Sequence, residues 1–169
     1  AYEITYGDWS SDVCSSDLQV TACIPRLRRY ARALTGDSLA ADDLVQDTLE
    51  RALTKRHLWR DGSDLRAWMF TIMHNVFVNQ IRSRAHESAL RDDDLPELEA
   101  PDRALDLLSV GDMDTALQKL PAEQREVLLL VALEDMSYLE TAKALEIPVG
   151  TVMSRLFRAR ERQIGRAHV

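Results

Sequence analysis

One stretch decides how the C-terminal part of this chain folds: SYLETAKALEIPVGTVMSRLFRARER, residues 137–162. Ser137 and Glu140 have the spacing of a capping box, in which each side chain accepts a hydrogen bond from the other residue's backbone amide. The run EIPVG at 146–150 then supplies a stop and a short turn, so a second helix is expected from Thr151. Helix, short turn and helix are the elements of a helix-turn-helix, whose second helix enters the major groove of DNA.

The apolar residues of this stretch predict how its two helices pack. We expect the first helix to bury Leu139, Ala142 and Leu145, because they recur at helical spacing. The small Ala142 would let the helices approach closely, and Ile147 and Val152 would fill their crossing.

The expected second helix is strongly basic, with Glu161 as its only acid. Guanidinium groups suit phosphate contacts and bidentate recognition of guanine, and hydroxyl groups at a helix start suit phosphates. A basic helix that only faces solvent is the alternative. With the capped helix and the turn before it, DNA binding is favoured. We predict DNA contacts from Thr151, Ser154, Arg155, Arg158 and Arg162.

Three further helices are expected in the N-terminal half of the chain. Residues 26–34 and 40–53 are helical in pattern and are separated by a Gly-containing turn. Residues 65–84 contain neither Gly nor Pro and predict a longer helix, capped by Ser63 or Asp64. Apolar stripes at helical spacing comprise Leu44, Val45, Thr48, Leu49, Ala52 and Leu53 in the second helix, and Leu65, Met69, Ile72 and Val76 in the third.

The net charge of −7 is unevenly distributed. Residues 87–114 hold ten acids against Arg91 and Arg103, so the rest of the chain is close to neutral and contains basic stretches. This acidic segment also contains two prolines and has little core-forming periodicity. It therefore predicts a linker between two helical bundles, and no alternating strand pattern is found elsewhere.

The second and third helices carry distinct polar faces. The face opposite the apolar stripe of 40–53 is acidic, although such a face usually does no more than contact solvent. Residues 65–86 contain no acid and combine arginines with aromatic side chains, which suits partly single-stranded DNA. The acidic face carries Asp43, Gln46, Asp47 and Glu50, and one face of the third helix carries Asn75, Asn79, Arg82 and His86.

No catalytic constellation is visible. The four histidines lack cysteine or carboxylate partners at metal-ligand spacing, and no Gly-rich phosphate loop occurs. Cys14 and Cys23 are expected to be free thiols. No apolar run approaches the ~20 residues needed to cross a bilayer. We expect a cytoplasmic protein without membrane insertion, metal, cofactor or enzymatic activity.

Three segments near the C-terminus resemble region 4 of the extracytoplasmic-function (ECF) sigma factors: LPAEQREV at 120–127, Ser137-Tyr138, and IPVGTVMSRL at 147–156. The resemblance implies a domain that reads the −35 promoter element and contacts the flap of RNA polymerase. Two positions depart from the family pattern. Glu146 stands where the family usually has Gly, at a helix end that often needs a positive φ. Met153 stands where Lys is usual, which would remove a phosphate contact.

Two segments of the N-terminal half resemble region 2 of the same family: DDLVQDT at 42–48 and LRAWMF at 65–70, followed by Asn75. The resemblance implies that the acidic helix docks on the polymerase clamp and that the third helix melts the −10 element. The preceding loop, 57–64, matches the loop that captures a flipped base. The implied DNA contacts are Arg60, Asp61, Trp68, Asn75, Asn79 and Arg82, although the family often has Asp at position 79.

The resulting prediction is an all-α fold of two small bundles joined by an acidic linker. Region 2 is assigned to 19–86, the linker to 87–111 and region 4 to 112–166, with 1–18 non-native or disordered. The implied function is a bacterial transcription initiation factor of the stress-response type. Its implied partners are core RNA polymerase, through clamp and flap, promoter DNA and an anti-sigma factor.

Two alternatives remain open at this point. A conventional helix-turn-helix regulator would bind palindromic sites as a homodimer and would not need the acidic face at Asp43 and Asp47. A sigma-like decoy would bind an anti-sigma factor without promoter activity, and it would need little of Arg155 and Arg158.

Overall fold

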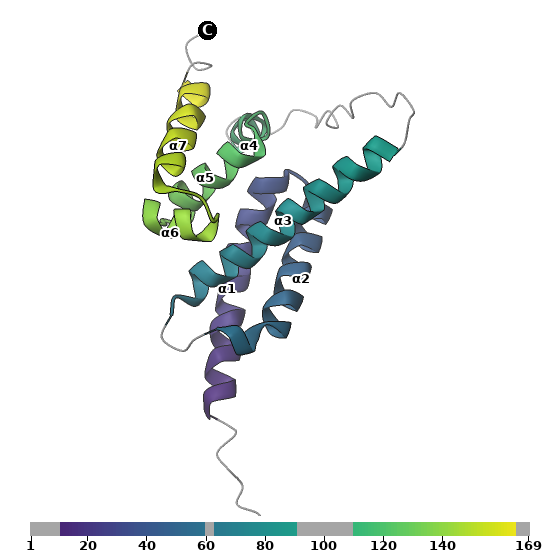
Figure 1. Cartoon of the computed structure of the whole chain (residues 1–169), viewed down its shortest axis with the longest axis vertical. Helices are drawn as coiled ribbons and strands as arrows, with labels where there is room; N and C mark the ends of the chain where they lie inside the picture. The colour runs from purple at the N-terminus through teal and green to yellow at the C-terminus, as the bar shows by residue number, and fades with distance from the viewer. Residues whose placement is uncertain (1–10, 60–62, 91–109, 165–169) are drawn as a thin grey trace, which may run out of the picture.

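The computed structural model describes residues 11–59, 63–90 and 110–164, and within these ranges every regular element is helical (Figure 1). The N-terminal bundle consists of α1 (Ser11–Thr35), α2 (Ser38–Thr54), the 3-10 helix η1 (Arg56–Leu58) and α3 (Leu65–Leu90). The C-terminal bundle consists of α4 (Val110–Gln118), α5 (Ala122–Ala132), α6 (Tyr138–Ala144) and α7 (Val149–Ile164). The prediction of an all-α fold is confirmed. None of the described helices is long and apolar enough to span a membrane.

The turn between α1 and α2 explains where both helices end. Gly36 terminates α1 with a φ of 71°, a conformation that glycine adopts without strain. A Cβ atom on Gly36 would meet the side chain of Gln118 at 2.5 Å, so α4 covers this turn closely. Asp37 caps α2 by accepting a hydrogen bond from the backbone amide of Ala40 at 2.9 Å.

The outer ends of α1 and α3 extend beyond the sequence prediction. α1 begins at Ser11, inside the segment 1–18 that was predicted to be non-native or disordered. α3 continues past Arg84 to Leu90. Asp64 caps α3 as predicted, because its carboxylate accepts from the backbone amides of the first turn. The predicted linker therefore has helical residues at both of its ends.

The predicted apolar stripes form the core of the N-terminal bundle, with one error. Tyr30 of α1 packs edge-on against Phe70 of α3, with ring centroids 5.1 Å apart. Leu53, however, is 57% exposed. At 100° per residue it lies well over 90° from the centre of the buried face of α2, so its burial was wrongly predicted. The buried stripe residues are Leu44, Val45, Thr48 and Ala52 in α2, and Leu65, Met69, Ile72 and Val76 in α3.

The helix-turn-helix of the C-terminal bundle forms as predicted at its start. The Ser137 amide donates to Glu140 Oε2 at 2.7 Å, and the Glu140 amide donates to Ser137 Oγ at 3.2 Å. Glu146 has a φ of 53°, the conformation for which glycine is the usual residue. The second helix begins at Val149, two residues before the predicted Thr151.

Leu139 was wrongly predicted to be buried. It is 66% exposed, whereas Ala142 and Leu145 are buried as expected. Residues three apart drift by about 60° around a helix, so a spacing of 3 and 6 does not keep all members on one side. Thr141 and Ala144 centre the buried face of α6 on the side away from Leu139.

The two bundles pack directly against each other. α1 contacts α4 and α5, and α3 contacts α6, so the C-terminal bundle lies along one side of the N-terminal one (Figure 1). Buried residues from both bundles join a single hydrophobic cluster, including Leu27 and Met69 from one and Val127 and Met136 from the other. The sequence patterns predicted a tether between two bundles but not this contact.

Candidate functional site

α7 presents a basic face to solvent. Val152, Leu156 and Ala159 are at most 3% exposed and pack this helix onto the bundle. Of the predicted DNA contacts, Ser154, Arg158 and Arg162 are exposed and Thr151 is half-buried. The structure therefore brings these four side chains to the outer side of one helix.

Arg155 lies on the same side of α7 but is paired with an acid of the bundle. Its Nη2 atom is 2.6 Å from Oε2 of Glu123 on α5, and only 23% of its side chain is exposed. The ion pair ties α7 to α5 within the C-terminal bundle. Because the guanidinium has a carboxylate partner, Arg155 is less available to a phosphate than Arg158 is.

Two large apolar side chains of α7 lie at solvent-exposed positions, which polar or charged residues usually occupy. Met153 is 51% exposed and Phe157 is 62% exposed. Their spacing of four places them on the same side of the helix. Met153 was predicted only as a missing cation and Phe157 was not predicted to be exposed, although their spacing of four can be read from the sequence.

The predicted acidic face of α2 is largely open to solvent. Asp43, Gln46 and Glu50 are exposed, whereas Asp47 is half-buried. Oδ2 of Asp47 accepts a hydrogen bond from Nε2 of Gln80 at 2.9 Å, which links α2 to α3. Asp47 thus helps to hold the bundle together and is only partly open to a partner, whereas the other three residues are exposed.

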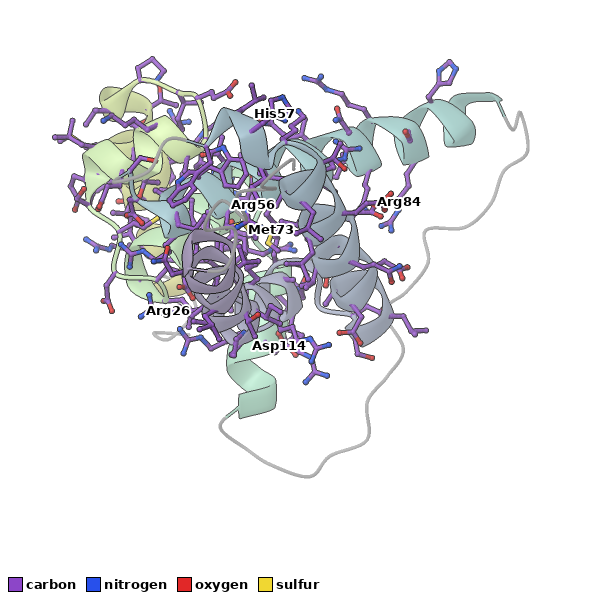
Figure 2. All side chains as sticks on the ribbon, turned by 90° about the horizontal axis from the view of Figure 1, so that it is seen from below. Arg26, Arg56, His57, Met73, Arg84 and Asp114 are labelled. Atoms are coloured by element: carbon purple, nitrogen blue, oxygen red, sulfur yellow. The ribbon has the colours of Figure 1, made fainter. Side chains whose placement is uncertain are left out.

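The predicted DNA contacts of α3 differ in exposure. Asn75, Asn79 and Arg82 are exposed along the helix, and Trp68 is half-buried beside a small pocket lined mainly by apolar residues. Figure 2 shows Met73 among the packed helices, whereas Arg84 projects from the outer part of α3. The remaining two predicted contacts, Arg60 and Asp61, lie outside the described residues.

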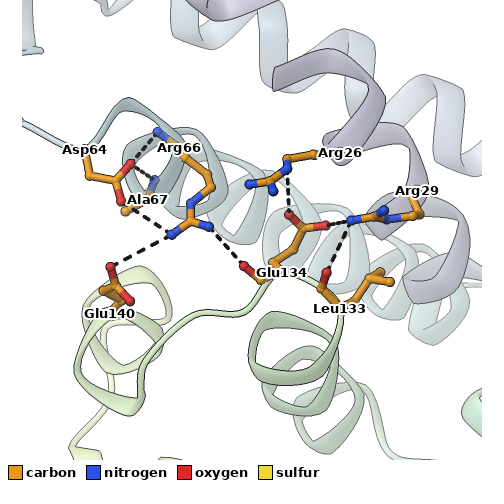
Figure 3. Close-up of polar contacts among 8 residues, drawn as sticks. All are labelled: Arg26, Arg29, Asp64, Arg66, Ala67, Leu133, Glu134 and Glu140. Atoms are coloured by element: carbon orange, nitrogen blue, oxygen red, sulfur yellow. Dashed lines mark hydrogen bonds and ion pairs between the residues drawn. The ribbon is translucent and has the colours of Figure 1, made fainter. Parts of the chain in front are cut away.

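Three arginines of the N-terminal bundle converge on Glu134, which lies between α5 and α6 (Figure 3). Arg29 Nη2 donates to Glu134 Oε1 at 3.0 Å and to the Leu133 carbonyl at 3.2 Å. Arg26 Nε lies 4.0 Å from Glu134 Oε2, and Arg66 Nη1 donates to the Glu134 backbone carbonyl at 3.0 Å. We call Arg26, Arg29, Arg66 and Glu134 the Glu134 cluster. No sequence motif predicted the Glu134 cluster.

Further polar contacts join the bundles, among them those of Arg125 and His74. The guanidinium of Arg125 on α5 donates to the carbonyl of Leu34 at the end of α1, as well as to the oxygens of Gln118 and the carbonyls of Leu117 and Leu120. His74 Nδ1 on α3 lies 2.8 Å from Glu126 Oε1 on α5. Arg125 and Glu126 are both buried, so these contacts are enclosed by the packed helices.

The titratable groups of this contact are shifted in the directions that their surroundings dictate. Burial lowers the pKa of the Arg125 guanidinium. Contacts with the hydroxyl and then the backbone amide of Ser137 lower the pKa of the Glu140 carboxyl, which also lies 3.9 Å from Arg66. Within 11–59, 63–90 and 110–164, no group of three or more His, Cys, Asp or Glu side chains could hold a metal ion.

Each of the two bundles contains a segment that matches a known family model. Residues 20–74 match the model described as the sigma2 domain of PhyR, and residues 111–162 match sigma-70, region 4. The chain is 39% identical over 144 residues to the ECF RNA polymerase sigma factor EcfG of Rhodopseudomonas palustris, which covers 85% of this chain and 80% of that protein. It is 38% identical over 137 residues to SigL of Mycobacterium tuberculosis, covering 77% and 76%.

Solved structures give the same picture. The sigma factor RpoE of Bartonella quintana, in complex with the anti-sigma factor NepR, superposes with a TM-score of 0.76 at 35% identity. The match covers 88% of this chain and 93% of RpoE. CnrH, in complex with the cytosolic domain of CnrY, has a TM-score of 0.67 at 26% identity, covering 95% and 93%.

Proposed function

This chain belongs to the ECF RNA polymerase sigma factors, and we propose that its two bundles divide the promoter between them. As a member of that family it is a non-enzymatic factor that directs promoter recognition by RNA polymerase. In our proposal, α2 docks the N-terminal bundle on the polymerase clamp through Asp43, Gln46, Asp47 and Glu50. α3 and the loop before it then open the −10 element, while α7 reads the −35 element and the C-terminal bundle contacts the flap.

One observation carries this proposal: the chain exposes two separate polar faces of opposite charge. The face on α2 is acidic and suits a basic partner, where charge complementarity sets the rate and register of docking. The face on α7 carries Arg158 and Arg162 and suits DNA phosphates and guanine edges. A palindrome-binding regulator would need only the second face.

Run-off transcription with core RNA polymerase tests the proposal. We expect transcripts from promoters with a matched −10 and −35 pair only when this protein is added. Substituting Asp43→Arg should strongly reduce stimulation at limiting protein concentration while leaving binding to duplex −35 DNA intact. If transcripts are equal with and without the protein on every promoter tried, the proposed function is wrong.

We also propose an anti-sigma partner and a cytoplasmic location beside the polymerase. The support for the partner is that RpoE and CnrH, similar over nearly their whole length, were each solved with an anti-sigma factor or a domain of CnrY. The decoy alternative has one point in its favour, the match of residues 20–74 to the sigma2 domain of PhyR. The exposed Arg158 and Arg162 favour a DNA-binding sigma factor instead.

A further inference from the structure

The contact between the bundles contains an anion site whose occupant belongs to the chain itself. Arg26 and Arg29 from α1 and Arg66 from the first turn of α3 surround Glu134, which is 0% exposed (Figure 3). The three cations come from the N-terminal bundle, and the carboxylate comes from the C-terminal one. Removing the C-terminal bundle would leave three guanidinium groups side by side at the start of the proposed melting helix.

Glu134 fills this site incompletely. Its Oε2 atom is buried without a hydrogen-bond partner and stays 4.0 Å from Arg26 Nε. Arg66 reaches the Glu134 backbone carbonyl, not the carboxylate, and its Nη2 atom lies 3.8 Å from Asp64 and 3.9 Å from Glu140. A backbone phosphate of DNA carries one negative charge on two free oxygens, as a carboxylate does, and guanidinium groups pair bidentately with either group. The cluster can therefore bind a backbone phosphate in place of the Glu134 carboxylate.

We propose that the Glu134 cluster is a binding site for backbone phosphates of promoter DNA, and that Glu134 occupies it until DNA displaces the C-terminal bundle. This proposal rests on the proposed function, because it adds Arg26 and Arg29 to the DNA contacts of the N-terminal bundle. Glu140 of α6 belongs to the same bundle as Glu134, so displacement of that bundle also separates Arg66 from Glu140. DNA binding and bundle docking then compete for the same cations, and each weakens the other.

Competition between DNA and Glu134 for the same arginines distinguishes a phosphate site from ion pairs that only hold the bundles together. Glu134→Gln and Arg29→Gln break the same ion pair, so both substitutions loosen the contact between the bundles. If the arginines only held the bundles together, both variants would bind DNA more tightly, because the binding-competent form would be more populated. If the arginines bind phosphate, the two variants change the affinity in opposite directions.

The experiment is an anisotropy titration of the full chain against a fluorescein-labelled fork-junction DNA with a 20-nucleotide single-stranded segment, from low to moderate salt. We expect Glu134→Gln to bind several-fold more tightly than wild type and Arg29→Gln several-fold more weakly. The salt slope for Arg29→Gln should fall by about 0.7, the value for one lost single-strand phosphate contact. The double variant should bind like Arg29→Gln.

The neighbouring Arg28→Gln is the matched control. Arg28 is exposed, pairs at 4.0 Å with Asp42 on α2 and is not part of the Glu134 cluster. The affinity of Arg28→Gln for the fork-junction DNA should therefore stay near that of wild type. If Glu134→Gln loses helical circular dichroism, Arg26→Gln carries the test, because the Arg26 side chain is half exposed and its ion pair with Glu134 is long, at 4.0 Å. Tighter DNA binding by Arg29→Gln or Arg26→Gln overturns the phosphate site. A transcription-competent protein with that result would leave the proposed function intact.

Discussion

Arg158 on α7 and Arg66 at the start of α3 belong to the two helices that we assign to promoter DNA, yet they lie in opposite environments. Arg158 is exposed on the outer side of the C-terminal bundle. Arg66 is enclosed by Glu134, Glu140 and Asp64, and only a quarter of its side chain is exposed. The basic face of α7, which we propose to read DNA, is thus exposed in this structure, whereas the first turn of α3, the proposed melting helix, is covered by the other bundle.

Docking of the bundles therefore covers the proposed −10 contacts at the start of α3 but leaves the proposed −35 contacts on α7 open to solvent. In the described part of the chain, the arginine ion pairs between the bundles join cations of the N-terminal bundle to Glu134 and Glu140 of the C-terminal one, and Glu134 is buried. Buried pairs of this kind contribute little net stability over an apolar contact, but breaking one partner is costly. Such pairs are therefore suited to fixing one docked arrangement of the bundles, which is lost when another anion takes the place of the acid.

The substitution with the largest expected effect is Arg125→Ala, which removes the buried guanidinium that joins α1, α4 and α5. The carbonyls of Leu34, Leu117 and Leu120 would lose their donor, and we expect unfolding free energy to fall by about 3 kcal/mol. Urea unfolding followed by circular dichroism measures it. A loss below about 1 kcal/mol would mean that Arg125 does not hold the bundles together.

Arg158→Ala tests the exposed half of the comparison. It should weaken binding to duplex DNA carrying the −35 element by about 1–3 kcal/mol, because a guanidinium contact with a base or phosphate is lost. The melting temperature should not change, since Arg158 is exposed. Arg160→Ala, on the same helix and also exposed, is the control for general loss of charge. Equal losses in both variants would argue against a specific role for Arg158.

Asp43→Arg tests the exposed acidic face of the N-terminal bundle. We expect the affinity for core polymerase to fall about tenfold, because a charge on the docking face is reversed. A competition assay against a labelled sigma factor reads this out. Asp47→Asn should behave differently: it weakens the hydrogen bond to Gln80 and lowers stability as well. If Asp43→Arg leaves the affinity unchanged, α2 is not the docking helix.

The smallest expected effect is a gain. Glu146→Gly removes a non-glycine residue from a φ of 53° and should raise stability by about 0.5–1 kcal/mol. A thermal melt should show an increase of a few degrees, with DNA and polymerase affinities unchanged. A lower melting temperature would show that the Glu146 side chain stabilises the turn in some other way.

The sequence predicted those features that depend on neighbours along the chain. The capping box at Ser137 and the Asp64 cap follow from local chemistry, and the positive φ at Glu146 agrees with the glycine that the family resemblance implied there. Leu139 and Leu53 were wrongly expected to be buried, because helical spacing alone does not fix which side of a short helix or last turn meets a neighbour. The Glu134 cluster was beyond such reasoning, since Arg29 and Glu134 are 105 residues apart and share no local pattern.

The most direct test of the covered melting helix is the distance between the bundles, measured by pulsed electron resonance. Spin labels would be placed at Arg51→Cys on α2 and Lys143→Cys on α6, both exposed positions, after replacing Cys14 and Cys23 with alanine. We predict one narrow, short distance distribution for the free protein and a clearly longer one with core polymerase and promoter DNA. An unchanged distribution in the transcription-competent complex would contradict the account, because the start of α3 would then act while covered.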